Sequence, residues 1–405
     1  MKLDTAFFLG LTMCLVLTAF GPLVGQANAK TRHSDRVVLI LLDSFSPHYM
    51  ALYDLPNLRK LTSEGVWYAR AQGVFPSNTT ANHTSILTGA YPNKTGIPNN
   101  SRYDRSLDRL RSPLRDIQVP TLPEILAEHS LVTVELAHFL LEGRQAISYK
   151  EHGPANFIKA LESHDPDLII YLDMDVDTQG HRRGPYNMQE VLSKTDADIG
   201  AIIDYLAKQD KLEGTTFIVA SDHSMVENSL PETAPKLLDN LKRAGFSVAT
   251  ANAQIRQDTD LVAITAGCIF LYIREGRLDQ TRYDQLLSLL KETPNTDVFT
   301  KDELMSKHTD PYALGDIVVA PRSGYVLTSG SGGGIHGIPE TQHTTLLLSG
   351  AGIRSGQVNG RANTVDIAPT ILHLLGLEVP EHMDGEILKG AIPSATLNWR
   401  SLLGL

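Results

Sequence analysis

Three continuous apolar runs in this sequence each lead into an acidic residue, and this repetition limits the possible folds more than any other feature. The runs are VVLILL before Asp43, LIIYL before Asp173, and TFIVA before the triplet Ser221-Asp222-His223. Runs without polar alternation are typical of strands buried on both faces of a parallel sheet. Ligands bind such sheets at the carboxyl ends of the strands. The sequence therefore predicts an α/β protein with a polar site at one edge of its sheet.

Amphipathic segments alternate with these strands along most of the chain, as expected for helices that cover a sheet. Glycine closes the first and the last of them. The predicted helices span 55–65, 119–130, 188–207 and 365–376, and the further strands span 66–71, 131–140 and 343–348.

The pattern changes between residues 227 and 334, where two amphipathic helices alternate with short apolar runs such as CIFLYI and DIVVAP. We expect a small α+β subdomain there, inserted between the core segments 30–226 and 335–405. The glycine-rich segment SGSGGG at 329–334 would provide a flexible return to the core.

The composition is that of a globular protein with an acidic balance. The chain has 405 residues, of which 42% are hydrophobic and 20% charged, and its net charge is −10 at pH 7. It is long enough for one large domain with an insertion. Binding to bulk nucleic acid is not expected, because phosphate backbones are bound by clustered Lys and Arg, and the sequence has no such cluster.

Residues 1–29 have the pattern of a secretory signal peptide. Lys2 precedes an apolar run, and Ala27-Asn28-Ala29 forms a small-x-small cleavage site. An uncleaved anchor is the alternative, since the apolar run approaches the ~20 residues that span a bilayer. Cleavage predicts a periplasmic or secreted protein without stable membrane association. Only Cys268 would then remain, so no internal disulfide is expected.

The stretch 75–100, FPSNTTANHTSILTGAYPNKTGIPNN, concentrates hydroxyl and amide side chains. Ser77 and Asn78 predict the start of a helix near Thr79, because such residues cap helix N-termini. Unpaired N–H groups at a helix N-terminus bind anions, and a threonine hydroxyl there could attack phosphorus if a cation lowered its pKa. Taken alone, the stretch favours a capped surface helix; the acids and histidines elsewhere shift the balance toward chemistry.

Asp177 and His181 flank a glycine, a spacing that would let a carboxylate and an imidazole converge on one ion from a tight turn. A calcium loop beginning at Asp173 is excluded, because Thr178 and Gly184 stand where that loop requires Gly and Glu.

Read singly, the other polar residues have structural alternatives. These are a helix cap for Asp43, a structural pair for Asp222-His223, and an ordinary loop residue for His336. Their recurrence at strand ends favours a shared site.

The stretch 75–100 also matches a family pattern, P-x-x-T-x-x-N-H followed by T-G-x-x-P and G-I-x-x-N. The matching residues are Pro76, Thr79, Asn82, His83, Thr88, Gly89, Pro92, Gly96, Ile97 and Asn100. Together with VVLILLD, this pattern resembles the nucleotide pyrophosphatase/phosphodiesterase branch of the alkaline phosphatase superfamily, and the resemblance covers about Val37 to Leu388. It implies an alkaline-phosphatase-like sandwich with a mostly parallel central sheet flanked by helices.

The resemblance also implies a two-metal site with Thr79 as the nucleophile. One ion would be held by Asp177, His181 and His336, and the other by Asp43, Asp222 and His223 together with Thr79. Nitrogen and carboxylate ligands suit zinc best, with manganese or iron as alternatives. The cations would lower the pKa of the Thr79 hydroxyl and stabilise the leaving oxygen, giving a phosphothreonine that water hydrolyses. Asn100, with the backbone N–H of Thr79 or Thr80, would hold the phosphate oxygens.

The predicted function is an exported, metal-dependent phosphodiesterase acting on small phosphate esters. Alternatives on the same fold are a phosphate monoesterase or phosphonate hydrolase, a mutase, and a sulfatase, whose C/S-x-P-x-R motif is absent near position 79. A secreted binding protein without catalysis is the alternative from another class.

Two sequence features bear on the substrate. Monoesterases of the superfamily place a Lys and an Arg in the segment corresponding to about 135–147, where this chain has Glu142 and Arg144. At most half of that clamp is present, which favours a diester. Thr80 replaces the aromatic residue that the family stacks on a base, so base selectivity is expected to be weak. His138 and Arg144 would line a cleft or lie in a solvated loop.

Overall fold

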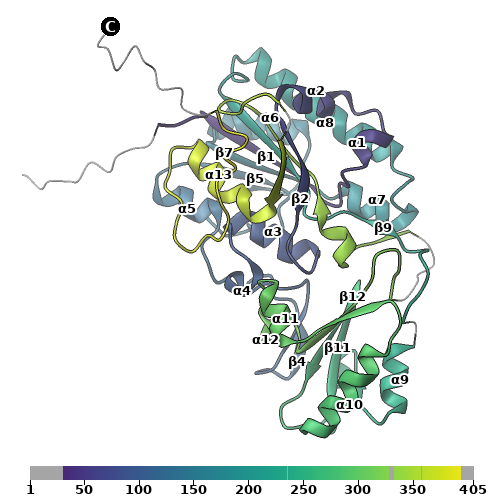
Figure 1. Ribbon diagram of the computed structural model, residues 1–405. Helices are drawn as coiled ribbons and strands as arrows, with labels where there is room; N and C mark the ends of the chain where they lie inside the picture. The colour runs from purple at the N-terminus through teal and green to yellow at the C-terminus, as the bar shows by residue number, and fades with distance from the viewer. Residues whose placement is uncertain (1–30, 235, 328–332, 357, 394–405) are drawn as a thin grey trace, which may run out of the picture.

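The structure, a computed structural model, comprises two lobes (Figure 1). The described residues are 31–234, 236–327, 333–356 and 358–393. The predicted signal peptide at 1–29 and most of the glycine-rich return at 329–334 lie outside them. The upper lobe contains the large sheet and most helices, and the lower lobe contains a smaller sheet (Figure 1).

The upper lobe is built on a mixed nine-stranded sheet within the described part of the chain, in the order β16-β2-β17-β8-β1-β7-β5-β6, with β18 also paired to β2. The strands from β8 to β6 in this order are parallel, and β17 runs antiparallel to both β8 and β2. The strands are β1 Arg36–Leu42, β2 Val66–Gln72, β5 Thr133–Leu136, β6 Ile147–Tyr149, β7 Leu168–Asp173, β8 Thr215–Ala220, β16 His343–Thr344, β17 Leu346–Gly350 and β18 Val358–Asn363. The predicted α/β fold with a mostly parallel core is thus observed.

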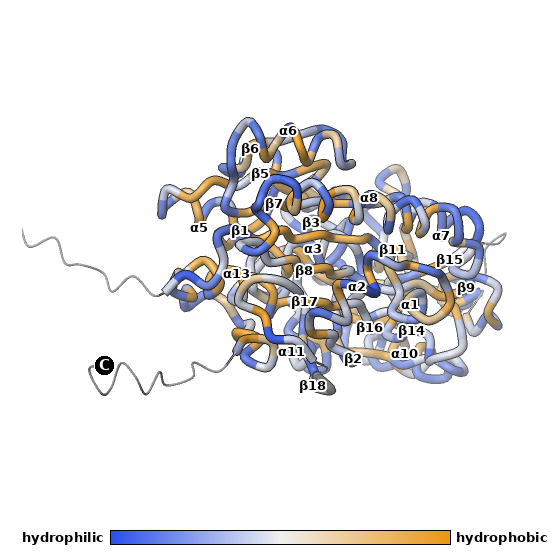
Figure 2. Tube along the Cα trace, turned by 90° about the horizontal axis from the view of Figure 1, so that it is seen from above, coloured by the Kyte–Doolittle hydropathy of each residue, from blue (hydrophilic) through white to orange (hydrophobic). Residues whose placement is uncertain are grey.

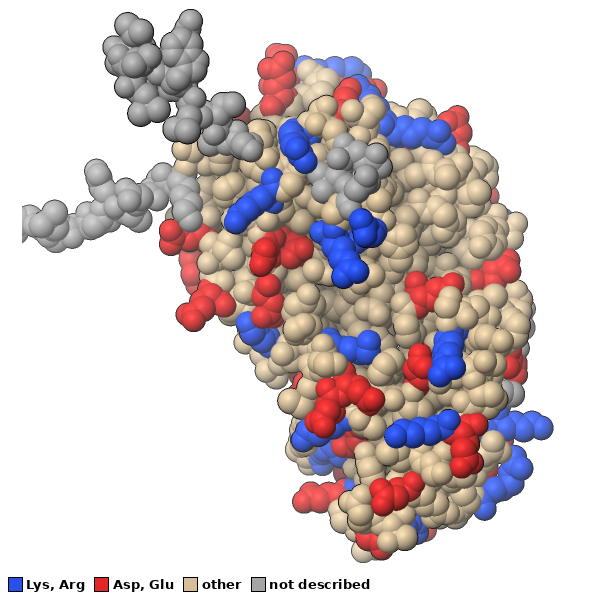
Figure 3. All heavy atoms as spheres, viewed as in Figure 1, with Lys and Arg blue, Asp and Glu red and all other residues tan. Residues whose placement is uncertain are grey.

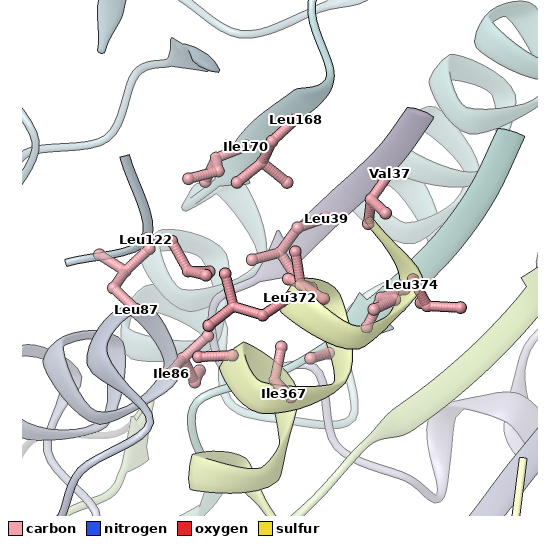
Figure 4. Close-up of a cluster of buried hydrophobic side chains, with 14 of the residues drawn as sticks. Val37, Leu39, Ile86, Leu87, Leu122, Leu168, Ile170, Ile367, Leu372 and Leu374 are labelled. Atoms are coloured by element: carbon pink, nitrogen blue, oxygen red, sulfur yellow. The ribbon is translucent and has the colours of Figure 1, made fainter. Parts of the chain in front are cut away.

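Both faces of this sheet are covered by helices, because alternate residues of each buried strand point to opposite sides. On one face, Val37 and Leu39 of β1 and Ile170 of β7 contact α3, α5 and α13 (Figure 4). On the other, Val38 of β1 and Tyr171 of β7 contact α1, α2, α6 and α8. The apolar strands accordingly occupy the interior (Figure 2).

The helices of this lobe are α1 Tyr49–Leu52, α2 Pro56–Glu64, α3 Thr79–Thr88, α4 Pro92–Thr95, α5 Leu122–Glu128, α6 Pro154–His164, α7 Asp175–Arg183, α8 Gln189–Lys208 and α13 Ile367–Leu374. Two short 3₁₀ helices, η2 Pro339–Gln342 and η3 Thr364–Asp366, belong to it as well.

The lower lobe is a five-stranded sheet in the order β10-β11-β12-β14-β13. One face packs on α9 and α10. The other contacts Phe75 and Tyr103, which come from the N-terminal part of the chain. Its elements are α9 Leu237–Arg243, β10 Val248–Ala249, η1 Asn252–Gln254, β11 Leu261–Ala266, β12 Cys268–Ile273, α10 Gln280–Lys291, β13 Thr296–Phe299, α11 Lys301–Ser306, α12 Pro311–Leu314 and β14 Ile317–Pro321.

Two small ribbons lie where the lobes meet. The hairpin of β3 Arg102–Asp104 and β4 Arg109–Arg111 carries Tyr103. β9 Val226–Glu227 pairs antiparallel with β15 Gly334–Ile335, so the two ends of the segment 227–334 lie side by side. The division into domains at these positions stays a prediction.

Three local predictions were wrong. The predicted strand 131–140 ends at Leu136, because Ala137 takes a left-handed conformation with φ 64° and turns the chain. The predicted strand 343–348 is broken at Thr345, whose hydroxyl donates to the Phe45 carbonyl oxygen. The segment expected to be a tight turn around Gly180 is the helix α7.

The helix α7 forms because its ends carry favourable charges. Asp175 and Asp177 lie in its first turn and His181 in its last, where acidic and basic groups complement the helix dipole. Asp173 also accepts a hydrogen bond from the Asp175 N–H at 2.8 Å. Asp177 and His181 are therefore one helical turn apart and on the same side of α7.

None of the helices in the described part of the chain has both the length and the apolar sequence needed to cross a bilayer. Lys and Arg side chains are interspersed with Asp and Glu on the face drawn in Figure 3. The expected lack of nucleic-acid binding stays a prediction.

Candidate active site

The residues predicted to bind metal come from separate segments that meet at the carboxyl edge of the central sheet. Asp43 follows β1 and is fully buried, as are Asp222 and His223 after β8. The others are Asp177 and His181 on α7, His336 directly after β15, and Thr79 as the first residue of α3.

Asp43, Asp222 and His223 form one convergent group of possible ligands. His223 Nε2 lies 3.1 Å from Asp222 Oδ2 and 3.5 Å from Asp43 Oδ1. The hydroxyl of Thr79 is 3.2 Å from the same His223 nitrogen. The three side chains predicted to bind the second ion and the predicted nucleophile thus lie around one point.

A second convergent group contains Asp177, His223 and His336. His336 Nε2 lies 3.9 Å from Asp177 Oδ1, and His181 Nε2 lies 3.3 Å from the same oxygen. The rings of His223 and His336 are stacked 3.8 Å apart, so the two groups adjoin. All seven side chains predicted as metal ligands therefore surround one region.

The predicted ligands include buried carboxylate oxygens that no group in the described part of the chain compensates, as expected for a cation site. Both carboxylate oxygens of Asp43 and Oδ2 of Asp222 are buried and without a hydrogen-bond partner among the described residues. Buried anionic oxygens of this kind are strongly unfavourable unless a cation compensates them. Burial, followed by Asp222 and Asp177, raises the pKa of Asp43 well above its ordinary value. These observations support cation binding by the group.

In a third cluster, formed by His152, Asp173 and Asp175, the carboxylates have hydrogen-bond or ion-pair partners in the protein. Asp173 accepts hydrogen bonds from the Thr195 hydroxyl and from the Asp175 N–H. Lys194 Nζ lies 3.5 Å from Asp175 Oδ2. The carboxylates of this cluster are already compensated by protein groups.

The three histidines in the predicted ligand set are oriented alike by the main chain. The Nδ1 atoms of His181, His223 and His336 lie 3.0 to 3.2 Å from the carbonyl oxygens of Gly334, Ser224 and Ser77, respectively. A carbonyl only accepts, so each Nδ1 carries the proton and each Nε2 keeps a free lone pair. Burial lowers the pKa of His223 and, with the neighbouring His223 and His181, that of His336 well below the ordinary value. Neutral imidazoles with inward lone pairs are the form that binds metal.

Thr79 begins a helix whose N-terminus is not capped as predicted. Asn78 occupies the N-cap position, but its Nδ2 donates to Asn99 Oδ1 at 2.7 Å instead of the side chain capping the helix. The N–H of Thr79 has no partner inside the helix. Nor is α3 a surface helix, because Thr80 to Thr88 are all buried.

Asn100 lies beside this helix start. Its Oδ1 accepts a hydrogen bond from the Thr80 N–H at 2.9 Å. Because the Thr80 N–H is already used, only the Thr79 N–H remains of the two backbone donors predicted for phosphate. The Nδ2 group of Asn100 has no hydrogen-bond partner among the described residues.

Three residues near the site were not among the predicted catalytic or metal-binding residues. The Ser44 hydroxyl donates to Asp177 Oδ1 at 2.8 Å, and its N–H donates to Asp222 Oδ1 at 3.2 Å. His83 is fully buried behind Asp222, and His138 is buried against His83 rather than in a solvated loop. Ser44 directly follows a predicted ligand, which is the one sequence signal that pointed to it.

Arg144 lies in a turn between β5 and β6, in agreement with the loop alternative. Its guanidinium pairs with Glu124 of α5 at 3.2 Å, and the two residues line a surface hollow with Gln145. Among the described residues, the ion-pair partners of Asp43, Asp177 and Asp222 are all histidines. Arg144 is therefore no longer a candidate phosphate contact.

Comparison with known proteins identifies the family. The profile of the family described as type I phosphodiesterase / nucleotide pyrophosphatase matches residues 37–149 and 143–345. Bis(5′-adenosyl)-triphosphatase of Mus musculus is 26% identical over 401 residues, covering 90% of this chain and 83% of that protein. The ectonucleotide pyrophosphatase/phosphodiesterase family member 5 of Homo sapiens is 22% identical over 396 residues, covering 88% of this chain and 79% of that protein.

Solved structures show the same fold. Murine ectonucleotide pyrophosphatase/phosphodiesterase 5 superposes with a TM-score of 0.70 at 20% identity, covering 88% of this chain and all of that one. An inactive threonine-to-alanine variant of the murine protein in complex with AMP superposes with a TM-score of 0.71 at 19% identity, covering 89% of this chain and 100% of that one. This chain belongs to the type I phosphodiesterase/nucleotide pyrophosphatase family and is a phosphoric ester hydrolase with an alkaline-phosphatase-like fold.

Proposed function

We propose that this protein is an exported two-metal phosphodiesterase in which Thr79 is the nucleophile. The observation that carries the proposal is the position of the Thr79 hydroxyl, at a helix N-terminus and 3.2 Å from His223, beside buried carboxylate oxygens that lack partners. A hydroxyl in such a place can be activated by a cation and can reach a phosphate held by free N–H groups.

The proposed ligands are Asp177, His181 and His336 for one ion, and Asp43, Asp222 and His223 for the other, with Thr79 also facing the second. Zinc suits this donor set of imidazoles and carboxylates best, and manganese or iron are alternatives. When bound, the two cations would neutralise negative charge on the phosphate and make the Thr79 hydroxyl more acidic.

The reaction begins with the substrate phosphate against the N-terminus of α3. The Thr79 N–H and the Nδ2 group of Asn100 donate to its non-bridging oxygens, because the Thr80 N–H is already bonded to Asn100 Oδ1 and leaves these two donors for the phosphate. Thr79 Oγ1 loses its proton to solvent and forms a bond to phosphorus as the bond to the leaving oxygen breaks, and the leaving oxygen takes up a proton from solvent and departs as an alcohol. Water then attacks the phosphothreonine, which releases Thr79 and a phosphate monoester.

A diester is the proposed substrate class. A monoester carries about one more negative charge near neutral pH, and additional cationic side chains would be needed to favour it. Such side chains are not found around the ligand carboxylates, since the described ion pairs there involve histidines only. The two relatives reported above are named as a bis(5′-adenosyl)-triphosphatase and as an ectonucleotide pyrophosphatase/phosphodiesterase, and neither name refers to a monoesterase.

Weak base selectivity is proposed as well. Thr80 stands where a stacking aromatic residue is expected, and only 4% of it is exposed. A threonine offers no stacking face, and a lost stack removes roughly 1–3 kcal/mol per base. A secreted or periplasmic location, cleavage after residue 29, and the division into a core and an insertion at 227–334 complete the proposal and rest on the sequence patterns.

The nucleophile is tested by comparing Thr79→Ala with Thr79→Ser. The alanine variant should lose several orders of magnitude in kcat toward bis-p-nitrophenyl phosphate, whereas the serine variant keeps the attacking oxygen and substantial activity. Both should fold, because Thr79 is partly exposed and its hydroxyl contacts only the site. Full activity of the alanine variant would assign the attack to another residue, and a serine variant as inactive as alanine would point to a structural role.

A further inference from the structure

We infer that His83 and His138 form a buried donor chain that positions the carboxylate of Asp222 for metal binding. The inference rests on the proposed metal site and adds two positioning residues to it. Neither histidine belongs to the predicted ligand set.

His83 lies directly behind the Asp43–Asp222–His223 group. Its Nε2 is 3.5 Å from Asp222 Oδ2 and 3.9 Å from Asp43 Oδ2, and its side chain is fully buried. This nitrogen has no hydrogen-bond partner among the described residues. Asp222 Oδ2 is the nearest acceptor, so any proton on His83 Nε2 is directed at it.

The main chain determines where the protons of the two histidines lie. The N–H of Leu140 lies 3.3 Å from His138 Nδ1, and an N–H can only donate. His138 Nδ1 is therefore an acceptor, and the proton of this ring is on Nε2. That atom lies 3.3 Å from His83 Nδ1, which must accept in turn. His83 consequently carries its proton on Nε2, facing Asp222.

His138 is fixed in position, so its ring can determine which nitrogen of His83 carries the proton. Its own N–H donates to Glu135 Oε2 at 2.7 Å, and its ring stacks on Phe139 with an interplanar angle of 14°. Only 2% of the residue is exposed. Burial, and then the neighbouring His83, lower the pKa of His138 well below its ordinary value, in agreement with a neutral ring.

This polarity is opposite to that of the three histidines proposed as ligands. Those rings have their protons on Nδ1 and direct a lone pair at the site, whereas His83 directs a proton there. His83 is therefore a donor to a ligand and not a ligand. By donating to Oδ2, it would hold the rotation of the Asp222 carboxylate, whose Oδ1 already accepts from the N–H groups of Ser44 and His223.

The test compares variants that remove the donor with variants that keep it. His83→Leu removes the N–H, while His83→Gln retains an amide N–H near the same place; His138→Leu and His138→Gln are the corresponding pair one step back. His152→Leu is the matched control, because His152 also lies beside two carboxylates but in the compensated cluster. Zinc affinity is measured by competition with a chromophoric chelator, and unfolding is followed with and without zinc.

We expect His83→Leu to weaken one of the two zinc equivalents about 10- to 100-fold, the usual cost of losing such an outer contact. At saturating zinc, this loss corresponds to about 1.4–2.8 kcal/mol less stabilisation by the metal. His83→Gln and His138→Gln should recover most of the affinity, His138→Leu should lose less than His83→Leu, and His152→Leu should bind like the wild type. The metal-free proteins should differ little in stability.

Three results would overturn the inference. Unchanged zinc affinity in His83→Leu would show that the donor has no effect. Equal losses in His83→Leu and His83→Gln would show that His83 binds the ion through a lone pair. Equal destabilisation of metal-free and metal-loaded protein would assign His83 a role in packing alone. If His83→Leu does not fold, the two His138 variants decide the matter by the same criteria. Failure of the wild type to bind zinc, manganese or iron would instead refute the proposed function.

Discussion

The turn between β11 and β12 touches the segment that carries His336, and the substitution Gly267→Ala tests what this contact does. Gly267 has φ +75°, and a Cβ added there would lie 2.8 Å from the carbonyl carbon of Gly337 and closer still to the carbonyl oxygen of His336. Cys268 strengthens the same contact, since its Sγ donates to the Gly337 carbonyl oxygen at 3.1 Å. The lower lobe thus braces the ligand segment directly.

The size of the effect follows from the overlap. Carbon atoms in contact are ordinarily about 3.5 Å or more apart, so the two backbones must separate by about 0.7 Å or more. β11 and β12 are buried in the lower lobe and have little freedom to retreat, so His336 should be displaced by much of this distance. Since a misplacement of about 1 Å can cost ~100-fold in rate, we expect kcat/KM to fall by ~10- to 100-fold.

Gly276→Ala is the matched control, because Gly276 has φ +70° in the same lobe but nothing within 4 Å of an added Cβ. Both variants carry the strain of a left-handed alanine, about 1–2 kcal/mol, and Gly267→Ala should lose additional stability through its backbone clash. The assay measures kcat/KM for bis-p-nitrophenyl phosphate, bound zinc per chain, and thermal unfolding. The reasoning is wrong if Gly267→Ala keeps full activity, or if Gly276→Ala loses as much.

Four further predictions concern the site itself. Ser44→Ala should lower kcat/KM ~10- to 100-fold with little loss of stability, since Ser44 contacts Asp177 and His223; an unchanged kcat/KM would leave the hydroxyl without a role. Chelation should abolish hydrolysis and zinc should restore it, and full activity after verified metal removal would exclude the two-metal site. The contribution of Asp43 to the stability of the metal-free protein, measured as the difference from Asp43→Asn, should decrease as pH rises above the ordinary carboxyl pKa of about 4. Burial raises the folded-state pKa of Asp43, so this group holds more protons in the folded than in the unfolded protein; a contribution that increases with pH in urea titrations would contradict this sign. On the zinc-loaded enzyme, bis-p-nitrophenyl phosphate should have a higher kcat/KM than p-nitrophenyl phosphate, with dinucleotides of different bases cleaved at similar rates; a preference for the monoester would identify a monoesterase.

The fold could be predicted because its strongest signals are local. Each buried strand is a short apolar run of its own, and the amphipathic helices between them are equally visible in the sequence. Predictions became wrong where long-range contacts decided the local structure. Thr345 interrupts a run of strand-forming residues because its hydroxyl bonds to Phe45, three hundred residues earlier in the chain. The turn at Ala137 likewise could not be predicted, because the left-handed position is occupied by alanine and not by the glycine that usually marks such a turn.

The candidate site divides in the same way. Residues that follow strands, such as Asp43 and Asp222, were identified from their positions, and their convergence follows from the parallel sheet. His83 and His138 could not be related to each other from the sequence, because fifty-five positions separate them and each alone resembles an ordinary core or loop residue. The position of Arg144 was left open between a cleft and a loop, since its partner Glu124 lies on a helix that the motif does not include.

The pairing of β2 has a consequence for the order in which the enzyme becomes active. All strands that pair with β2 come from the last part of the described chain, namely β16, β17 and β18, which lie from residue 343 onward. During synthesis or translocation, β1, β7 and β8 can assemble first, while β2 and the Thr79 segment that follows it have no sheet to join. The nucleophile would therefore be the last part of the site to be fixed in place. A fragment ending before His343 should be inactive and should be cleaved by proteases around β2. The hydrolase would then have no activity until nearly the whole chain has been synthesised.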